Sequence, residues 1–213
     1  MKTKDKILQY SLQLFNDEGE QNVTPVDIAN VLDISPGNLY YHFKGKDPII
    51  HQLFLDFEEE FLMVLNAPID KPLELSDNWV YFYILFEEIA DFRFFYRNLQ
   101  SILERYPELE SRFRKLVRQK VKTMTSILSN LDKSGFLAIS EVELDQMAER
   151  FALQLTYWPT YQALLDVQTS TPVSIHKGVF GLISQLTPYV VEGADEFLIL
   201  LTEFRDKMLK NVS

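Results

Sequence analysis

A short run near residue 40 carries the side chains best suited to molecular recognition in this sequence. Tyr40, Tyr41 and His42 place hydrogen-bonding tips on flat apolar rings, which suits contact with phosphate oxygens and base edges. Lys44 and Lys46 follow at once, and no acidic residue interrupts the run. These residue types indicate a surface for double-stranded DNA rather than a catalytic site.

Two short helices are expected to position these side chains. Thr24 resembles the cap of the first helix, with Asp27 three residues later completing a capping box and Pro25 at the first helical position. Ser35 and Pro36 repeat this pattern at the start of the second helix. Two short helices joined by a tight turn are typical of a helix-turn-helix.

The second helix has one apolar and one polar face. Leu39 and Phe43 are four residues apart and share a face that can dock on the first helix. Pro36, Gly37 and Asn38 then point outward with the tyrosines. Gly37 allows close approach of the backbone, and a helix N-terminus favours a phosphate.

The whole chain predicts an all-α fold. Its 213 residues include only 7 glycines and 9 prolines against 16 Phe, 10 Tyr and 2 Trp, which favours long helices around a bulky core. We expect an N-terminal three-helix helix-turn-helix domain over 1–46 and a larger C-terminal helical bundle over 47–213, with a helix from about 47 to 66 joining them. The expected helices are 3–18, one starting at 24, 35–43, 47–66, 74–90, 92–105, 107–134, 141–167, 172–190 and 194–210, with a linker between Pro68 and Pro72 and kinks at Pro159 and Pro188.

Composition argues against several classes of protein. There is no cysteine, and the three histidines lack the spacing of metal ligands, so neither a metal site nor a cofactor is expected. Gly45-Lys46 lacks the rest of a phosphate-binding loop, and enzyme activity is not expected. The longest strongly apolar run, 79–86, is eight residues, whereas a membrane span needs about 20. With no signal peptide visible, we expect a cytoplasmic protein without membrane contact.

The first quarter of the chain resembles a known family. The residues that carry the likeness are Lys6-Ile7-Leu8, Leu14-Phe15, Gly19, Thr24, Ile28-Ala29 and Ser35-Pro36-Gly37-Asn38-Leu39-Tyr40-Tyr41-His42-Phe43-Lys44-Gly45-Lys46. They resemble the DNA-binding domain of TetR/AcrR-type transcriptional regulators. The resemblance implies an all-helical homodimer, a C-terminal effector pocket and an operator that the protein leaves when a ligand binds.

The resemblance also implies roles for single residues. Contacts to phosphates are implied for Thr24, Ser35, Tyr41, His42 and Lys46, and positions nearest the bases for Pro36, Gly37, Asn38 and Tyr40. One departure from the family is Asp33, in the turn, where the family usually has glycine or another residue. Aspartate tolerates the left-handed conformation, so we expect the turn to be kept.

Net charge is the main argument against DNA binding. The chain carries a formal charge of −10, and residues 1–50 hold five lysines against seven acids. The segment 35–46 nevertheless carries two lysines and no acid. We therefore expect specific operator binding at low to moderate salt, with weak affinity for random DNA.

The aromatic C-terminal region is expected to hold a small-molecule effector. The expected lining consists of Phe82, Phe86, Phe95, Tyr157, Trp158, Tyr161 and Gln162. For any single aromatic residue, filling of the core is the competing explanation. Dimerisation is expected to use an apolar face of 172–190 that includes Phe180 and Ile183, together with part of 141–167.

These observations predict a ligand-responsive DNA-binding regulator, expected to act as a repressor. Each subunit would place the helix 35–43 in a major groove, so a two-fold dimer requires a pseudo-palindromic operator. A helical carrier protein with a vestigial helix-turn-helix is the alternative, and the acidic N-terminal region is its best support.

Overall fold

The computed structural model describes residues 2–67, 75–165 and 169–212, and this part of the chain is all-α. Its only β pairing is an isolated bridge between Leu137 and Val190. In chain order the elements are α1 (Thr3–Glu18), η1 (Glu20–Asn22), α2 (Pro25–Val31), α3 (Pro36–His42), α4 (Asp47–Leu65), α5 (Leu75–Asp91), α6 (Arg93–Arg97), α7 (Leu99–Arg105), α8 (Pro107–Lys133), α9 (Glu141–Leu165), α10 (Thr171–Ile183), η2 (Ser184–Tyr189) and α11 (Ala194–Val212), where η marks a 3-10 helix. The expected fold class is confirmed.

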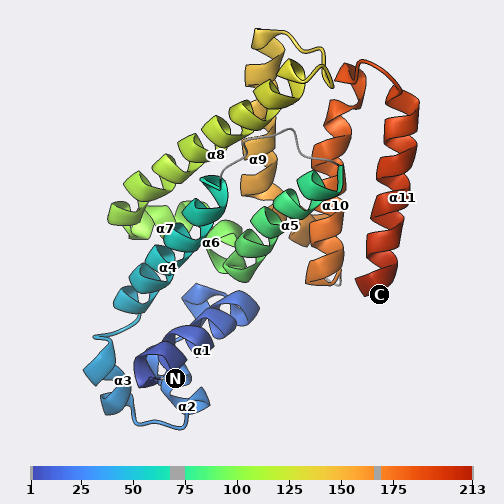
Figure 1. The fold of residues 1–213 in the computed structure, drawn as a ribbon. Coiled ribbons are helices and arrows are strands. Elements are labelled where there is room, and N and C mark those ends of the chain that lie inside the picture. The colour runs from blue at the N-terminus through green and yellow to red at the C-terminus, as the bar shows by residue number, and fades with distance from the viewer. Residues whose placement is uncertain (1, 68–74, 166–168, 213) are drawn as a thin grey trace.

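The first three helices form a small unit at one end of the molecule (Figure 1). Ile7 and Phe15 of α1, Ile28 of α2 and Leu39 of α3 are all buried, as is Phe43 just after α3. Burial of a large apolar side chain contributes about 1.5–3 kcal/mol. The four-residue spacing of Leu39 and Phe43 therefore does fix which face of α3 turns inward.

Helix α4 runs from this unit into the larger bundle, where it packs on α1, α5 and α8. Its buried stripe includes Phe54, Phe57 and Phe61. The ring of Phe57 lies 5.2 Å from that of Phe61, 5.3 Å from Phe92 and 5.8 Å from Tyr96, measured between centroids. This aromatic contact joins α4 to α6.

Two expected helices end earlier than the pattern predicted. The segment 92–105 divides at Asn98 into α6 and α7, because asparagine competes for backbone hydrogen bonds and breaks short helices. The segment 172–190 is α-helical only to Ile183 and continues as η2, which contains Pro188 and its missing N–H. Helix α9 continues through Pro159. The expected linker at Pro68–Pro72 lies outside the described residues.

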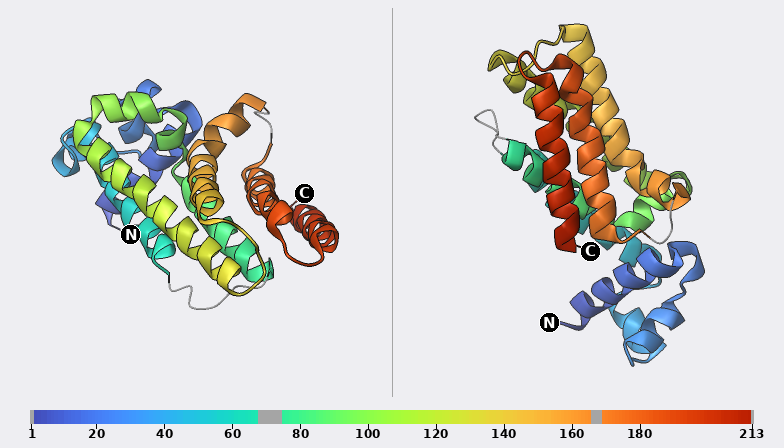
Figure 2. Two further views of the ribbon diagram at one scale, coloured as in Figure 1. Left: turned by 90° about the horizontal axis from the view of Figure 1, so that it is seen from above. Right: turned by 90° about the vertical axis from the view of Figure 1, so that its right-hand side faces the viewer.

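Helix α10 lies between α9 and α11 in the C-terminal bundle (Figure 2). The guanidinium of Arg205, on α11, lies 4.4 Å from the ring centroid of Phe180, and Ile183 is buried. Part of the face expected to pair with a second subunit is therefore covered within the chain. Exposed apolar side chains lie on α9, at Leu153, Tyr157, Tyr161, Leu164 and Leu165, and on α11, at Leu198, Ile199 and Leu200.

A fully buried lysine lies among aromatic rings where α4, α6, α8 and α9 meet. The Nζ atom of Lys120 is 5.0–5.7 Å from the ring centroids of Phe61, Tyr96 and Phe113, and it donates to Oγ1 of Thr156 at 3.0 Å. No carboxylate forms an ion pair with it among the described residues. Burial lowers the pKa of Lys120 to about 7.

We predict that Lys120→Met stabilises the protein most below neutral pH. Because the unfolded lysine has a pKa of about 10.4, the unfolded wild type binds the extra proton between about pH 7 and pH 10, and its stability rises with pH there. Removing the buried amine should raise the free energy of unfolding by about 1–4 kcal/mol near pH 6.5, with a smaller gain near pH 9.5. Urea unfolding at both pH values measures this, and Lys115→Met, at an exposed position of α8, is the control. An equal gain at both pH values would contradict the assignment.

Candidate functional site

The start of α2 is closed by the expected capping box. Oγ1 of Thr24 accepts a hydrogen bond from the backbone N–H of Asp27 at 3.2 Å, and the Thr24 N–H donates to Oδ2 of Asp27 at 2.8 Å. The Thr24 hydroxyl also donates to the same carboxylate at 2.6 Å, and these bonds lower the pKa of Asp27. The Thr24 hydroxyl proton is therefore already used within the chain, beside a negative charge.

The turn into α3 uses the one residue that departs from the family pattern. Asp33 has a φ of 52°, and among the described residues other than glycine it alone has a positive φ. Because aspartate tolerates this left-handed conformation, the turn forms without glycine, as expected. Oγ of Ser35 then caps α3 by accepting from the backbone N–H of Asn38 at 3.1 Å.

The outer face of α3 presents its aromatic tips to solvent. Tyr40 is 60% exposed and Tyr41 is 82% exposed, whereas Leu39 is 1% exposed. The ring of Tyr41 meets that of His42 edge to face at 5.2 Å between centroids. Pro36, Gly37, Asn38 and Lys44 are exposed as well. The structure thus gathers most of the expected DNA-binding set on one outward surface.

Lys46 is the exception, because its ammonium points into the protein. Its Nζ donates to the carbonyls of Glu20 at 2.7 Å and Val23 at 3.1 Å, and lies 3.4 Å from a carboxylate oxygen of Glu20. The expectation that Lys46 faces a phosphate is corrected accordingly. This lysine ties the start of α4 to the segment before α2, and its donors are occupied there.

Lys4 adds a positive charge that the motif alone does not contain. Its Nζ lies 5.5 Å from the ring centroid of Phe43, which follows α3 directly. Lysine charge from the exposed start of α1 therefore reaches the same edge as Lys44. The alternation Lys2, Lys4, Lys6 was the available sequence signal, but its place beside α3 follows only from the packing of α1.

The end of α1 is fastened to the larger bundle by polar contacts. The buried amide of Asn16 donates to the carbonyl of Asp91 at 2.7 Å and accepts from the backbone N–H of Phe94 at 3.0 Å. Next to it, Asp17 pairs with Arg93 at 2.8 Å. We call these contacts of Asn16 and Asp17 with residues 91–94 the α1 clamp.

A second connection uses the buried carboxylate of Glu20. It pairs with Arg105 of α7 at 2.6 Å as well as with Lys46. Nearby, the hydroxyl of Tyr106 donates to Asp47 at the start of α4, at 2.9 Å. The unit of α1, α2 and α3 carries the expected DNA-binding surface, and we call it the DNA-facing unit. It is held at two places, by the junction of α5 with α6 and by the end of α7.

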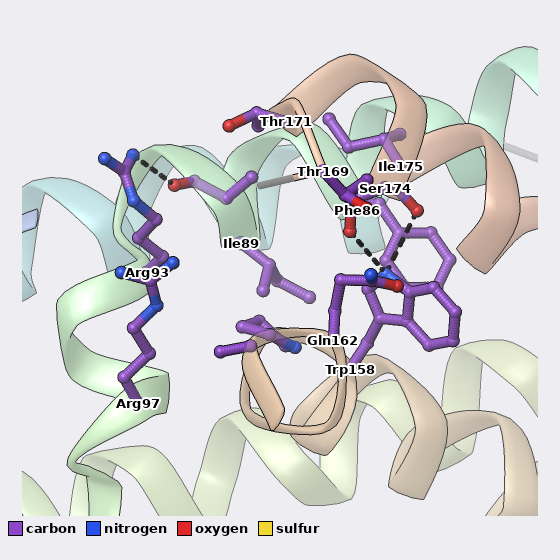
Figure 3. Close-up of a pocket in the computed structure, with 13 residues that line it drawn as sticks. Phe86, Ile89, Arg93, Arg97, Trp158, Gln162, Thr169, Thr171, Ser174 and Ile175 are labelled. Carbon is purple, nitrogen blue, oxygen red and sulfur yellow. Dashed lines mark hydrogen bonds between the residues drawn. The ribbon is translucent and has the colours of Figure 1, made fainter. Parts of the chain in front are cut away.

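A cavity of about 220 Å³ lies between α5, α6, α9 and α10 (Figure 3). It shares Arg93 with the α1 clamp. Three residues of the expected effector set line it: Phe86, Trp158 and Gln162. The indole N–H of Trp158 donates to both the carbonyl and the hydroxyl of Ser174 at 3.1 Å. The cavity combines an apolar floor with several polar groups.

The other four expected effector residues lie elsewhere. Phe82 lines a separate, mostly apolar cavity of about 340 Å³. Phe95 is buried in the aromatic core, 4.0 Å from the ring of Phe94 between centroids. Tyr157 and Tyr161 are exposed on α9, at 52% and 54%. The sequence pattern could not separate core and surface aromatics from cavity-lining ones, because all recur at helical spacing.

Two classes of site find no support in the described residues. No group of three or more histidine or carboxylate side chains is placed to hold a metal ion there. Within the same part of the chain, no helix is both long and apolar enough to cross a membrane. The arrangement that stands out is instead the capped, outward-facing α3.

A short helix docked on its predecessor and exposing its polar face defines a helix-turn-helix protein. Comparison with known families makes the class more specific. Residues 7–53 match the family of bacterial regulatory proteins called tetR, and residues 56–197 match a family described as bacterial transcriptional repressor. The chain therefore belongs to the TetR family.

Relatives with solved structures or curated descriptions agree. A TetR-family transcriptional regulator from Marinobacter aquaeolei is 32% identical, with a TM-score of 0.85, over 98% of this chain and 99% of that one. The transcriptional regulator QacR of Staphylococcus aureus is 30% identical over 53% of this chain and 65% of its own length. The repressor KstR2 of Mycolicibacterium smegmatis is 31% identical over 32% of this chain and 37% of its own. The chain thus spans less than two thirds of either curated relative.

Proposed function

We propose that this protein is a ligand-responsive transcriptional repressor that binds a pseudo-palindromic double-stranded DNA operator in the cytoplasm. The observation that carries the proposal is the exposed polar face of α3 on a capped, well-packed helix. In this proposal Pro36, Gly37, Asn38 and Tyr40 lie nearest the bases. Ser35, Tyr41, His42 and Lys44 contact phosphates, and the backbone around Thr24 lies near the same strand.

Lys46 has a different role in the proposal. It holds the segment before α2 against the start of α4 and so positions α3, while Lys44 and Lys4 supply the exposed charge. This distribution supports operator binding despite the acidic composition, because only the edge beside α3 has to be positive. The proposed division at residue 46 separates this DNA-facing unit from the effector and dimerisation region.

We further propose that the protein acts as a homodimer through α9. Leu153, Tyr157, Tyr161 and Leu164 recur at three- and four-residue steps and are 52–83% exposed. An exposed apolar stripe of this kind is typical of a subunit interface. A two-fold axis beside α9 would present two copies of α3 to one duplex, with half-sites about one helical turn or a multiple apart.

In this proposal a small molecule that binds the C-terminal region releases the protein from its operator. The protein is thus proposed to be a regulator and not an enzyme. The cavity between α5, α6, α9 and α10 adjoins the α1 clamp, so a ligand there can act on the orientation of the DNA-facing unit. Typical coupling between two such sites is about 1–3 kcal/mol.

Selection from a random duplex pool, followed by mobility shift, tests the proposal. We predict that the wild type enriches a two-fold-symmetric sequence and that Tyr40→Ala binds it about tenfold or more weakly, because a base-edge contact is lost. Tyr10→Ala, at a 38% exposed tyrosine on α1, is the matched control and should bind normally. Both variants should keep wild-type helicity and dimerisation. Failure to enrich any sequence would favour the helical carrier instead.

The two lysines after α3 should behave differently in salt. We predict that Lys44→Gln weakens binding to all duplexes and lowers the slope of log affinity against log salt by about one, because a phosphate contact is lost. Lys46→Gln should leave that slope unchanged and lower the melting temperature, since its ammonium is bonded within the protein. A loss of slope in Lys46→Gln with unchanged melting would reverse the two roles. Mobility shifts across a salt series and thermal unfolding measure both.

A further inference from the structure

Two arginines line one side of the cavity between α5, α6, α9 and α10. Arg93 and Arg97 are four residues apart and so share a face of α6. Figure 3 shows them together along one side, with Trp158 and Phe86 on the other. None of the described lining residues is acidic.

The guanidinium of Arg97 has little compensation within the protein. It donates to the backbone carbonyl of Asn16 at 3.4 Å, and no carboxylate forms an ion pair with it in the described ranges. Partial burial and the neighbouring Arg93 lower the pKa of Arg97, while Asp17 acts in the opposite direction. A partly buried cation of this kind gains more from a bound anion than an exposed one does.

Three acidic residues near the end of α5, Glu87, Glu88 and Asp91, do not line the cavity. Burial, followed by repulsion from Glu60, Asp91 and Glu87, raises the pKa of Glu88 to about 7. Burial raises the pKa of Asp91, and Arg93 acts in the opposite direction. Arg93 therefore already has carboxylate neighbours in Asp91 and Asp17, whereas Arg97 forms no ion pair among the described residues.

We propose that this cavity binds an amphipathic carboxylate whose charged end meets Arg97 and Arg93 and whose apolar body lies against Phe86, Ile89 and Trp158. The inference rests on the proposed function, since it names the chemical class of the effector. The small volume, about 220 Å³, suits a compact molecule with one ring or a short chain. The guanidinium fork matches the two oxygens of a carboxylate.

Arg93 and Arg97 also connect the ligand site to the DNA-facing unit. Arg93 pairs with Asp17 of α1 at 2.8 Å, and Arg97 bonds the carbonyl of Asn16. A carboxylate in the cavity competes with Asp17 for Arg93 and loosens the α1 clamp. Ligand and operator therefore oppose each other, because each favours a different partner for the same guanidinium.

Calorimetric titration with three probes that share one apolar body tests the ligand class. Phenylbutyrate should bind the isolated wild-type protein about tenfold more tightly than phenylbutanol or phenylbutylamine, as expected for a charge-assisted hydrogen bond. Equal affinity for the three probes, preference for the amine, or no binding of the carboxylate would overturn the proposal.

Three variants locate the binding. Arg97→Gln should lose most of the preference for phenylbutyrate while keeping its affinity for phenylbutanol. Arg118→Gln, which removes the same charge from an exposed position on α8, should behave as wild type. Asp17→Asn should bind phenylbutyrate more tightly, because it frees Arg93. Unchanged carboxylate affinity in Arg97→Gln would place the ligand elsewhere.

The outcome separates this inference from the proposed function. The probe titration uses protein without DNA, whereas operator binding is measured without a probe. If the protein binds phenylbutyrate selectively but enriches no DNA sequence, only the repressor assignment is contradicted. If it enriches an operator but binds the three probes equally, only the carboxylate site is contradicted.

Discussion

The buried amide of Asn16 is the contact on which the orientation of the DNA-facing unit depends. It bonds the last carbonyl of α5 and the second N–H of α6, so both of its ends are fixed by backbone of the larger bundle. A buried amide that loses such partners costs about 1–3 kcal/mol, which makes this geometry strongly preferred. The α1 helix, with α2 packed on it and α3 packed on α2, therefore follows any movement of the α5–α6 junction.

This constraint connects regions that serve different purposes. The arginines of α6 face the cavity with part of their surface and the α1 clamp with another part. On the other side, Glu20 links Lys46 and Arg105 and so keeps the start of α4 in place. The ring of Phe57 packs on Phe92 and Tyr96 and so joins α4 to α6. Packed side chains thus connect the cavity with the DNA-facing unit that carries α3.

Local patterns predicted the recognition unit well. The caps at Thr24 and Ser35, the inward face of Leu39 and the left-handed Asp33 all depend on residues within four positions, and each is confirmed. The same reasoning placed the long helices and the all-α class. Local patterns were sufficient here because helix caps and residue spacing act within a few positions, whatever the rest of the chain does.

Features set by distant contacts were not predictable from local patterns. Lys46 turns inward to a segment 26 residues earlier in the chain, and Asn16 meets a carbonyl 75 residues later. The covering of α10 by α11 likewise arises from tertiary packing. Aromatic residues at helical spacing fill core, cavity and surface alike, so only three of the seven expected effector residues line one cavity.

The distance between the two DNA-facing units of a dimer tests the central claim most directly. Because the chain has no cysteine, Gln21→Cys at an exposed position of η1 gives a single site for a spin label. Pulsed electron paramagnetic resonance should show one distance between the labels of the two subunits. The distribution of this distance should become narrower when the selected operator is added, and its mean should change when phenylbutyrate is added. Absence of a dipolar coupling between two labels would contradict the account, as would a distance distribution that neither the operator nor phenylbutyrate changes.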